Sequence, residues 1–255
     1  MDTPGTIAVA GATGRAGRHV VDALRVKGHR VVAMSRSNGV DIVTGEGLAE
    51  ALEGVQSIVD VATGESPEQA AATEFFTVTT RNLQEAGARA GVERIVVVSI
   101  IGIDRFTGGY GAAKLVHEQA MLAGPIPAQI LRAAQFHELV AQLTDWGRDG
   151  EVSRVPRMRT QLVSAQAVGQ ELADLAIDQG EPSNDPIPEI AGPRVEELVQ
   201  MATLLAARRG DPVRIEGVTD PNDPDGELYE AGALLPGPHA KLVGPTFQDW
   251  LDATS

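Results

Sequence analysis

The chain has 255 residues, 43% of them hydrophobic, and carries a formal net charge of −14. This length allows one large α/β domain, or one domain with an appendage, and a sizeable core. The acidic balance disfavours binding to nucleic acid or to an anionic membrane. The absence of cysteine excludes disulfides and thiolate chemistry. No apolar run reaches the ~20 residues that span a bilayer, and no basic segment followed by an apolar one opens the sequence, so we expect a cytoplasmic protein.

A short β-strand-like run at 6–10 leads into three glycines spaced three apart, Gly11, Gly14 and Gly17. This pattern predicts a strand, a tight turn and a helix over about 15–27. The glycines serve the turn, the close approach of a phosphate, and the packing of helix on strand. The first turn of the helix offers free N–H groups to a pyrophosphate. Because the chain has 28 glycines, a Gly-rich turn with a purely structural role is the alternative.

Strands alternate with helices through the rest of the first half. We predict strands over 30–34, 40–43, 57–62, 95–99 and 128–133, and helices over 47–52, 67–90 and 110–123. Residues 95–99 are apolar without alternation, which is typical of a central parallel strand. The alternation predicts a doubly wound parallel sheet, a Rossmann fold, whose ligands bind at the carboxyl ends of the strands. The residues expected at that rim are Gly11, Ser35, Thr63, Ser99 and Gln135.

Beyond residue 134 the alternation is less regular, so we expect a dinucleotide-binding core over 1–134 and a small substrate-side cap within 135–255. Predicted helices cover 135–146, 165–178 and 195–209; a polar, basic stretch covers 152–160 and a Pro-rich acidic linker 181–188. Residues 187–191 are expected to return to the sheet, and 211–226, rich in Pro and Asp, to form an exposed loop. Four residues are expected to pack the cap: Leu234, Leu235, Phe247 and Trp250.

Tyr110 and Lys114 are four residues apart in a predicted helix, so they share one face. An ammonium beside a phenol stabilises the phenolate, which lowers the pKa of the tyrosine and lets it exchange a proton nearer neutral pH. Ser99, eleven residues earlier at the end of a strand, can offer its hydroxyl to a substrate carbonyl. The alternatives are a solvated helix face for the pair and a strand-end cap for the serine.

The end of the second predicted strand indicates the choice of cofactor. A site that prefers NAD places a carboxylate there for the ribose 2′-hydroxyl. Here the strand is followed by Ser35 and Arg36, and Arg15 lies within the glycine turn. Two guanidinium groups and a hydroxyl suit a 2′-phosphate, because arginine forks match phosphate oxygens. We therefore expect NADP(H) to be preferred over NAD(H).

Several motifs occur together: Gly-Ala-Thr-Gly-Arg-Ala-Gly at 11–17, Val-Ser-Ile-Ile-Gly-Ile-Asp at 98–104, Tyr110-x-x-x-Lys114, and Leu-Arg-Ala-Ala-Gln-Phe at 131–136. With these the chain resembles the short-chain dehydrogenase/reductase superfamily, in particular its atypical NmrA-like, NAD(P)-binding members. Val61-Ala62-Thr63-Gly64 stands where standard members have Asn-Asn-Ala-Gly.

The resemblance implies catalytic roles for Ser99, Tyr110 and Lys114, with Lys114 also holding the nicotinamide ribose. It places an adenine contact at Asp41 and Ile42. Together with the strand-end argument, it leads us to expect cofactor contacts from Gly11, Thr13, Gly14, Arg15, Ala16, Gly17, Ser35, Arg36, Asp41, Ile42, Ala62, Thr63 and Lys114.

Gln135, Phe136 and His137 follow the last strand of the predicted core, where a pocket role and a structural role both stay open. His117 is expected only to decorate its helix, and its spacing from His137 predicts no metal site. We predict an NADPH-dependent reductase of a small carbonyl, quinone or enone substrate, with Tyr110 as proton donor. The alternative is a non-catalytic NADP(H)-binding redox sensor of NmrA-like type. The intact Tyr–Lys pair favours the enzyme, and the sequence makes no prediction of oligomeric state.

Overall fold

A computed structural model describes residues 4–220 and 223–254 of the chain. The chain divides into two compact units, which we treat separately. The first unit consists of Met1–Ser99, Gly109–Leu131 and Ala165–Pro188; the second consists of Ile100–Gly108, Arg132–Ser164 and Glu189–Ser255. No helix of the described residues is long and apolar enough to cross a membrane.

The main sheet has the strand order β12-β9-β5-β4-β3-β1-β2, which confirms the predicted doubly wound Rossmann fold. Its strands in the first half are β1 (Thr6–Ala10), β2 (Arg30–Met34), β3 (Ser57–Asp60), β4 (Arg94–Ile100) and β5 (Ala128–Ala133). β1 pairs in parallel with both β2 and β3, and β3 with β4, so their carboxyl ends lie along one edge. All four residues of β3 are buried, as expected of a strand covered on both faces.

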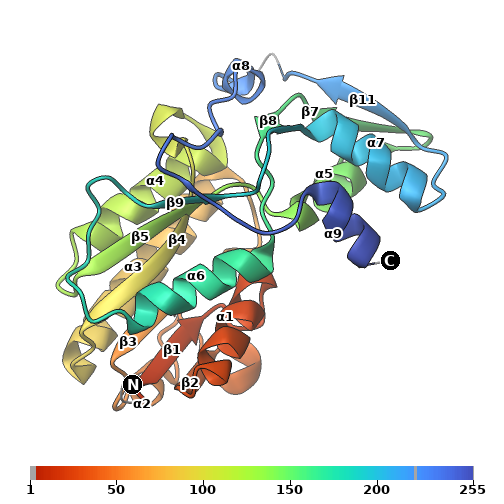
Figure 1. The fold of residues 1–255 in the computed structure, drawn as a ribbon. Coiled ribbons are helices and arrows are strands. Elements are labelled where there is room, and N and C mark those ends of the chain that lie inside the picture. The colour runs from red at the N-terminus through yellow and green to blue at the C-terminus, as the bar shows by residue number, and fades with distance from the viewer. Residues whose placement is uncertain (1–3, 221–222, 255) are drawn as a thin grey trace. The chain divides into compact units, whose positions relative to one another are not determined.

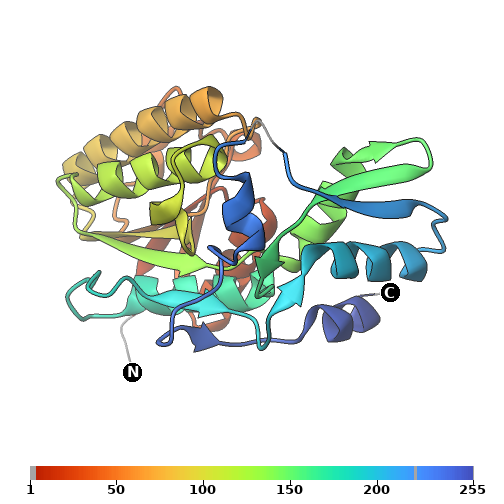
Figure 2. The same ribbon diagram turned by 90° about the horizontal axis from the view of Figure 1, so that it is seen from above.

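Helices cover both faces of the sheet in the first unit (Figures 1 and 2). α1 (Arg15–Val26) packs against α6 (Ala165–Ile177) on one face, and α3 (Gln69–Ala90) packs against α4 (Gly109–Leu122) on the other. The short α2 (Leu48–Ala51) contacts α3. α3 ends where Gly91 adopts a φ of +79°, a left-handed conformation that favours glycine. The buried core of this unit includes Leu48, Ile58, Leu83 and Ile95.

The second unit has its own apolar core, which includes Val140, Val155, Leu162, Leu198 and Phe247. Its helices are α5 (His137–Trp146), α7 (Leu198–Arg208), α8 (Gly226–Glu230) and α9 (Phe247–Ala253). Its strands are β6 (Arg148–Asp149), β7 (Val152–Pro156), β8 (Arg159–Thr160), β9 (Glu189–Ala191), β10 (Glu196–Glu197), β11 (Arg214–Val218) and β12 (Lys241–Leu242). β9 pairs with the end of β5, at Arg132 and Ala133.

The strand expected over 40–43 is absent, and that prediction was wrong. The segment is a turn in which Asp41 Oδ1 accepts hydrogen bonds from the backbone N–H of Val43, at 2.8 Å, and of Thr44, at 3.4 Å. An aspartate that bonds its own backbone two residues on offers the chain an alternative to a sheet ladder.

The prediction of an exposed loop over 211–226 was also wrong, because residues 214–218 form β11, which pairs in parallel with β7. At its other end Asp225 is buried and accepts hydrogen bonds from Thr107 and from Gly108 N–H. The stretch 152–160, described from sequence only as polar and basic, holds β7 and β8. The helix expected from residue 195 begins at Leu198, because Glu196 and Glu197 pair with β8.

Among the residues expected to pack the cap, Leu234 and Phe247 are buried, while Leu235 and Trp250 are partly buried.

Candidate functional site

The glycine turn joins β1 to α1 at the carboxyl edge of the sheet. Gly11 has a φ of +77°, and a Cβ there would lie 2.8 Å from Ala62 Cα. A Cβ at Gly17 would overlap the carbonyl oxygen of Gly11. At Gly14, however, an added Cβ would meet only the Gly11 oxygen, at 3.2 Å, among the described atoms. Two of the glycines are therefore required by packing, whereas Gly14 borders open space.

The amino end of α1 lacks a side-chain cap. Gly14 is the residue that precedes the helix, and within the described residues it makes no side-chain cap hydrogen bond to the first turn. Such a turn presents N–H groups without helical partners together with the positive end of the helix dipole. Thr13 and Arg15 are exposed beside it, while Ala16 and Gly17 are buried against the fold.

Ser35 and Arg36 directly follow β2, as expected from the sequence. Ser35 Oγ lies 2.9 Å from Ser37 Oγ, and Arg36 Nη2 lies 3.1 Å from Glu65 Oε1. The Arg36 and Glu65 side chains are 75% and 85% exposed, so this ion pair contributes little to stability. Sequence reasoning missed Glu65, because nothing in the local pattern links it to a residue 29 positions earlier.

The residues expected near adenine lie in the turn that follows β2. The backbone oxygens of Ile42 and Val43 both accept hydrogen bonds from Asn82 Nδ2 of α3, each at 2.9 Å. The Asp41 carboxylate is used within the turn itself. Ala62, which backs Gly11, donates its N–H to Asp60 Oδ1 at 3.0 Å, and Thr63 beside it is exposed.

Ser99, Tyr110 and Lys114 all belong to the first unit, which also holds every expected cofactor residue. Ser99 lies near the end of β4 with 3% of its surface exposed, and its Oγ has no hydrogen-bond partner in the described part of the chain. Tyr110 lies in the first turn of α4, with its ring 5.9 Å from the ring of Phe76. Lys114 is buried one turn later, where Nζ donates to the backbone oxygen of Val98 at 2.8 Å.

The lowered tyrosine pKa expected from the sequence does not occur in this structure. Burial, and to a lesser extent the charge of Asp60, raise the pKa of Tyr110 to about 12. The physical reason is that the Lys114 ammonium is bound to Val98 and His117. Burial lowers the pKa of Lys114 itself to about 8, against the opposing charges of Asp60 and Glu118. Tyr110 is therefore a protonated phenol at neutral pH.

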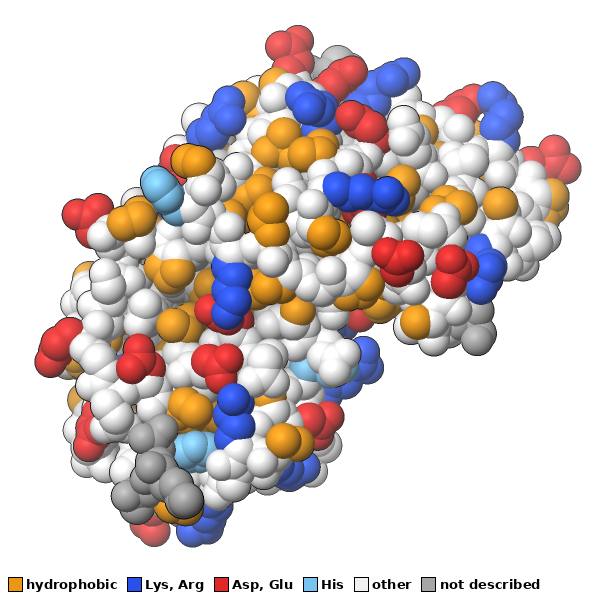
Figure 3. All heavy atoms as spheres, in the orientation of Figure 1, with side chains coloured by type: hydrophobic (Ala, Val, Ile, Leu, Met, Phe, Trp, Pro, Cys, Tyr) orange, Lys and Arg blue, Asp and Glu red, His pale blue; other side chains and the backbone are white. Residues whose placement is uncertain are grey.

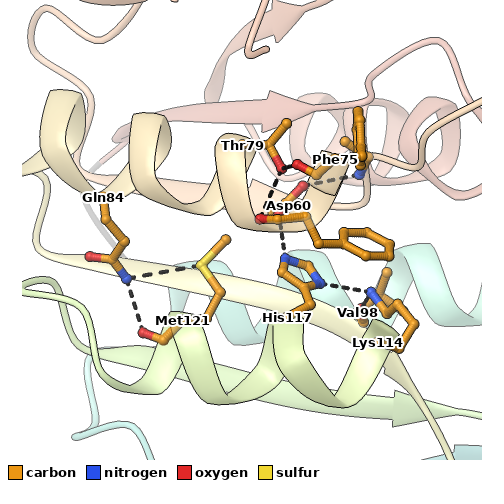
Figure 4. Close-up of polar contacts among 10 residues, drawn as sticks. Asp60, Phe75, Thr79, Gln84, Val98, Lys114, His117 and Met121 are labelled. Atoms are coloured by element: carbon orange, nitrogen blue, oxygen red, sulfur yellow. Dashed lines mark hydrogen bonds and ion pairs between the residues drawn. The ribbon is translucent and has the colours of Figure 1, made fainter. Parts of the chain in front are cut away.

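His117 was expected only to decorate its helix, and this was wrong. Its Nδ1 lies 2.9 Å from Lys114 Nζ and its Nε2 lies 3.2 Å from Asp60 Oδ2, as Figure 4 shows. The ring stacks on Phe76, with centroids 4.5 Å apart and 13° between the planes. Sequence reasoning missed Asp60; the signal was a single carboxylate at the end of an apolar strand.

Gln135, Phe136 and His137 belong to the second unit. Gln135 Oε1 accepts a hydrogen bond from Thr160 Oγ1. Phe136 is partly buried. His137 is fully buried among aromatic rings of α9, with centroids 5.8 Å from Phe247 and 5.1 Å from Trp250. Burial lowers the pKa of His137 to about 4, so the imidazole is neutral near pH 7.

Comparison with known proteins identifies an NAD(P)H-binding segment in the chain. Residues 11–136 match a family described as NAD(P)H-binding. No curated protein sequence matches the chain. The NAD(P)H-binding match covers the glycine turn together with Ser99, Tyr110 and Lys114.

Three solved structures that share the fold span nearly the whole chain. A new type of NADPH-dependent quinone oxidoreductase from Escherichia coli is 17% identical with a TM-score of 0.65, covering 97% of this chain and 99% of that one. A UDP-N-acetylglucosamine 4-epimerase from Bacillus cereus is 17% identical with a TM-score of 0.68, covering 98% and 94%. The enzyme WbmG of Bordetella bronchiseptica, solved with NAD, is 14% identical with a TM-score of 0.67, covering 98% and 95%.

Proposed function

We propose that the protein is an NADPH-dependent reductase of a small carbonyl, quinone or enone substrate, with Tyr110 as proton donor. The observation that carries this proposal is the buried Ser99 hydroxyl, which has no partner among the described residues. Leaving such a group unpaired costs about 1–3 kcal/mol. A substrate oxygen at the end of β4 would supply the missing partner, in the unit that also contains Tyr110 and Lys114.

The chain's own residues fit the cofactor. The open space at Gly14 and the uncapped first turn of α1 suit a pyrophosphate. The exposed guanidinium groups of Arg15 and Arg36 suit the 2′-phosphate that distinguishes NADPH from NADH. This supports the preference for NADP(H).

Tyr110 suits reduction rather than oxidation, because a phenol whose pKa is about 12 keeps its proton at neutral pH. When bound, NADPH would supply the hydride that reduces the substrate. The oxygen of a carbonyl or enone substrate would then become an alkoxide or enolate, a stronger base than a phenolate, and would take the Tyr110 proton. The Ser99 hydroxyl donates a hydrogen bond to the same oxygen. Lys114 uses two of its three ammonium protons on Val98 and His117, which leaves one for the cofactor ribose.

A second candidate function is a non-catalytic NADP(H)-binding redox sensor. One observation favours it: Lys114 is hydrogen-bonded inside the unit, and no hydrogen bond between it and Tyr110 occurs within the described residues. A sensor needs no proton donor, so the two functions predict opposite effects of removing the phenol.

The Tyr110→Phe substitution separates them. We expect turnover of a confirmed substrate to fall by about 10²–10⁴, while the affinity for NADPH, followed by fluorescence titration, stays nearly unchanged. The control is Tyr229→Phe, which removes the other tyrosine, in the second unit, and should leave turnover intact. Lys114→Ala should lower both turnover and cofactor affinity. No NADPH oxidation across a panel of carbonyls, quinones and enones would favour the sensor, and a fully active Tyr110→Phe enzyme would remove Tyr110 from the mechanism.

A further inference from the structure

Three buried ionisable side chains form a continuous row in the first unit. Asp60 lies at the end of β3, and His117 and Lys114 lie one turn apart on α4. Their exposed fractions are 2%, 1% and 4%. Lys114 Nζ is 2.9 Å from His117 Nδ1, and His117 Nε2 is 3.2 Å from Asp60 Oδ2 (Figure 4). Burying such charged groups costs free energy unless each of them is paired. We therefore ask what function this arrangement serves.

The chemistry of the three groups sets the direction of these hydrogen bonds. A lysine ammonium only donates and an aspartate carboxylate only accepts. His117 must therefore accept from Lys114 at Nδ1 and carry its own proton at Nε2, which it donates to Asp60. Burial and the neighbouring charge of Lys114 lower the pKa of His117, which keeps the ring neutral in this single tautomer.

Further contacts hold the row at both ends. The second carboxylate oxygen of Asp60 accepts the N–H of Ala62, the residue that backs Gly11 in the glycine turn. Phe76 of α3 stacks on the His117 ring and also lies under the Lys114 ammonium, with Nζ 4.6 Å from the ring centroid. The carboxylate, the imidazole and the ammonium thus each have a fixed partner from another element.

The charges around Lys114 come from few groups. Burial favours its neutral form, whereas the Asp60 carboxylate on β3 and the Glu118 carboxylate on α4 favour the ammonium. The Val98 carbonyl of β4 and the Phe76 ring of α3 add uncharged acceptors. Asp60 reaches Lys114 through a hydrogen-bonded bridge by way of His117.

We propose that Asp60 and His117 are positioning residues for Lys114, which hold its ammonium against the Val98 carbonyl and keep it protonated in a buried site. The inference rests on the proposed function only in the role given to Lys114. Two of its ammonium protons are donated to Val98 and His117, and the third is the one presented to the cofactor ribose. The positive charge of Lys114 then stabilises the buried Tyr110 phenolate that remains after proton transfer.

The test is an NMR titration of the ligand-free, full-length protein with isotope-labelled lysine and histidine. The chain has only three lysines, Lys27, Lys114 and Lys241, so their signals are readily assigned. We expect Lys114 to titrate near pH 8 in the parent protein and His117 to show a proton on Nε2. In Asp60→Asn the Lys114 midpoint should fall by about one pH unit or more. The added amide N–H₂ also faces His117 Nε2, so the His117 tautomer should change.

Two further variants keep the test sharp. Asp174→Asn makes the same substitution in the same unit at the carboxylate that pairs with Lys27, at 2.8 Å, and should leave the Lys114 midpoint unchanged. His117→Phe keeps the stack on Phe76 but breaks the bridge, and should lower the midpoint even if Asp60→Asn does not fold. An Nδ1-protonated His117 in the parent protein, or a Lys114 midpoint unmoved by His117→Phe, would overturn the proposal. Because neither cofactor nor substrate is present, failure of the reductase proposal would leave this result standing.

Discussion

At the scale of single residues, the ability of Arg36 to bind a phosphate depends on one neighbour, Glu65. Its guanidinium lies where a 2′-phosphate is expected, yet it already contacts the Glu65 carboxylate at 3.1 Å. Both side chains are largely exposed, so the contact is weak and a phosphate with a higher charge can replace it. In the proposed function Glu65 would act against the binding of NADPH, because its charge has the same sign as the phosphate.

We expect Arg36→Ala to lower the affinity for NADPH about tenfold, or about 1.4 kcal/mol, with little effect on NADH. Glu65→Gln should raise the affinity for NADPH by roughly twofold to threefold, since a nearby like charge is removed. Fluorescence titration of both cofactors with each variant measures the two effects, and NADH serves as the internal control. Equal losses for NADPH and NADH in Arg36→Ala would show that Arg36 does not recognise the 2′-phosphate.

At the scale of elements, the turn between β1 and α1 separates structural from functional glycines. A Cβ at Gly17 would overlap the Gly11 carbonyl oxygen, whereas a Cβ at Gly14 needs only a small adjustment of that oxygen, 3.2 Å away. The Gly14 backbone has φ −74° and ψ 179°, which a side chain tolerates. The turn is thus packed tightly at Gly17 and open at Gly14.

Gly14→Val should abolish cofactor binding and leave a folded protein, because the side chain would occupy the space for the pyrophosphate. Gly17→Val should instead destabilise the fold and lose binding as a consequence. Circular dichroism melting paired with cofactor titration distinguishes the two variants. A Gly14→Val protein that is unfolded, or one that binds NADPH normally, would contradict this assignment.

The loop between β4 and α4 is another element fixed by a distant segment. Asp225 accepts hydrogen bonds from Thr107 N–H and Gly108 N–H, each at 2.7 Å, and from Thr107 Oγ1 at 3.0 Å. These contacts fasten the second unit's 100–108 segment, which leads directly into the helix that carries Tyr110. Asp225 is thus part of the fold of the second unit.

At the scale of the whole molecule, a buried histidine contributes to the response to acid. On the face drawn in Figure 3, acidic and basic side chains are interspersed with uncharged ones. The formal net charge of −14 reflects 35 acidic against 21 basic residues. Within the second unit, His137 is fully buried, and burial lowers its pKa to about 4. The unfolded chain, with an ordinary histidine pKa of 6.5, binds the proton more readily than the folded one.

We therefore expect stability from His137 to be fully present above pH 6.5 and to be lost as the pH falls to about 4. The shift corresponds to roughly 3 kcal/mol of unfolding free energy. His137→Phe keeps an aromatic ring beside Phe247 and Trp250 and should flatten this part of the pH profile in urea unfolding. His239→Phe, at an exposed histidine of the same unit, is the control and should not change the profile. Parallel profiles for the parent and His137→Phe would refute the prediction.

The sequence alone determined the features that local pattern controls. The Rossmann sheet follows from apolar strands alternating with helices, and the turn at residues 11–17 from glycine spacing, since both depend on neighbours within a few residues. Local pattern gave wrong predictions where a side chain or a distant strand offered other hydrogen bonds. The strand expected over 40–43 is a turn because the Asp41 side chain bonds the backbone there. Part of the loop expected over 211–226 is a strand because residues 214–218 pair with β7.

Only the tertiary structure decided the surroundings of the candidate active site. Asp60 and His117 are 57 residues apart and meet because β3 and α4 pack within one unit. His117, held by Asp60, binds the Lys114 ammonium in the interior of the unit. Burial raises the pKa of Tyr110 instead of lowering it. Spacing along a helix places Tyr110 and Lys114 on one face, but the protonation of each depends on burial and on charges from other elements, which no local pattern encodes.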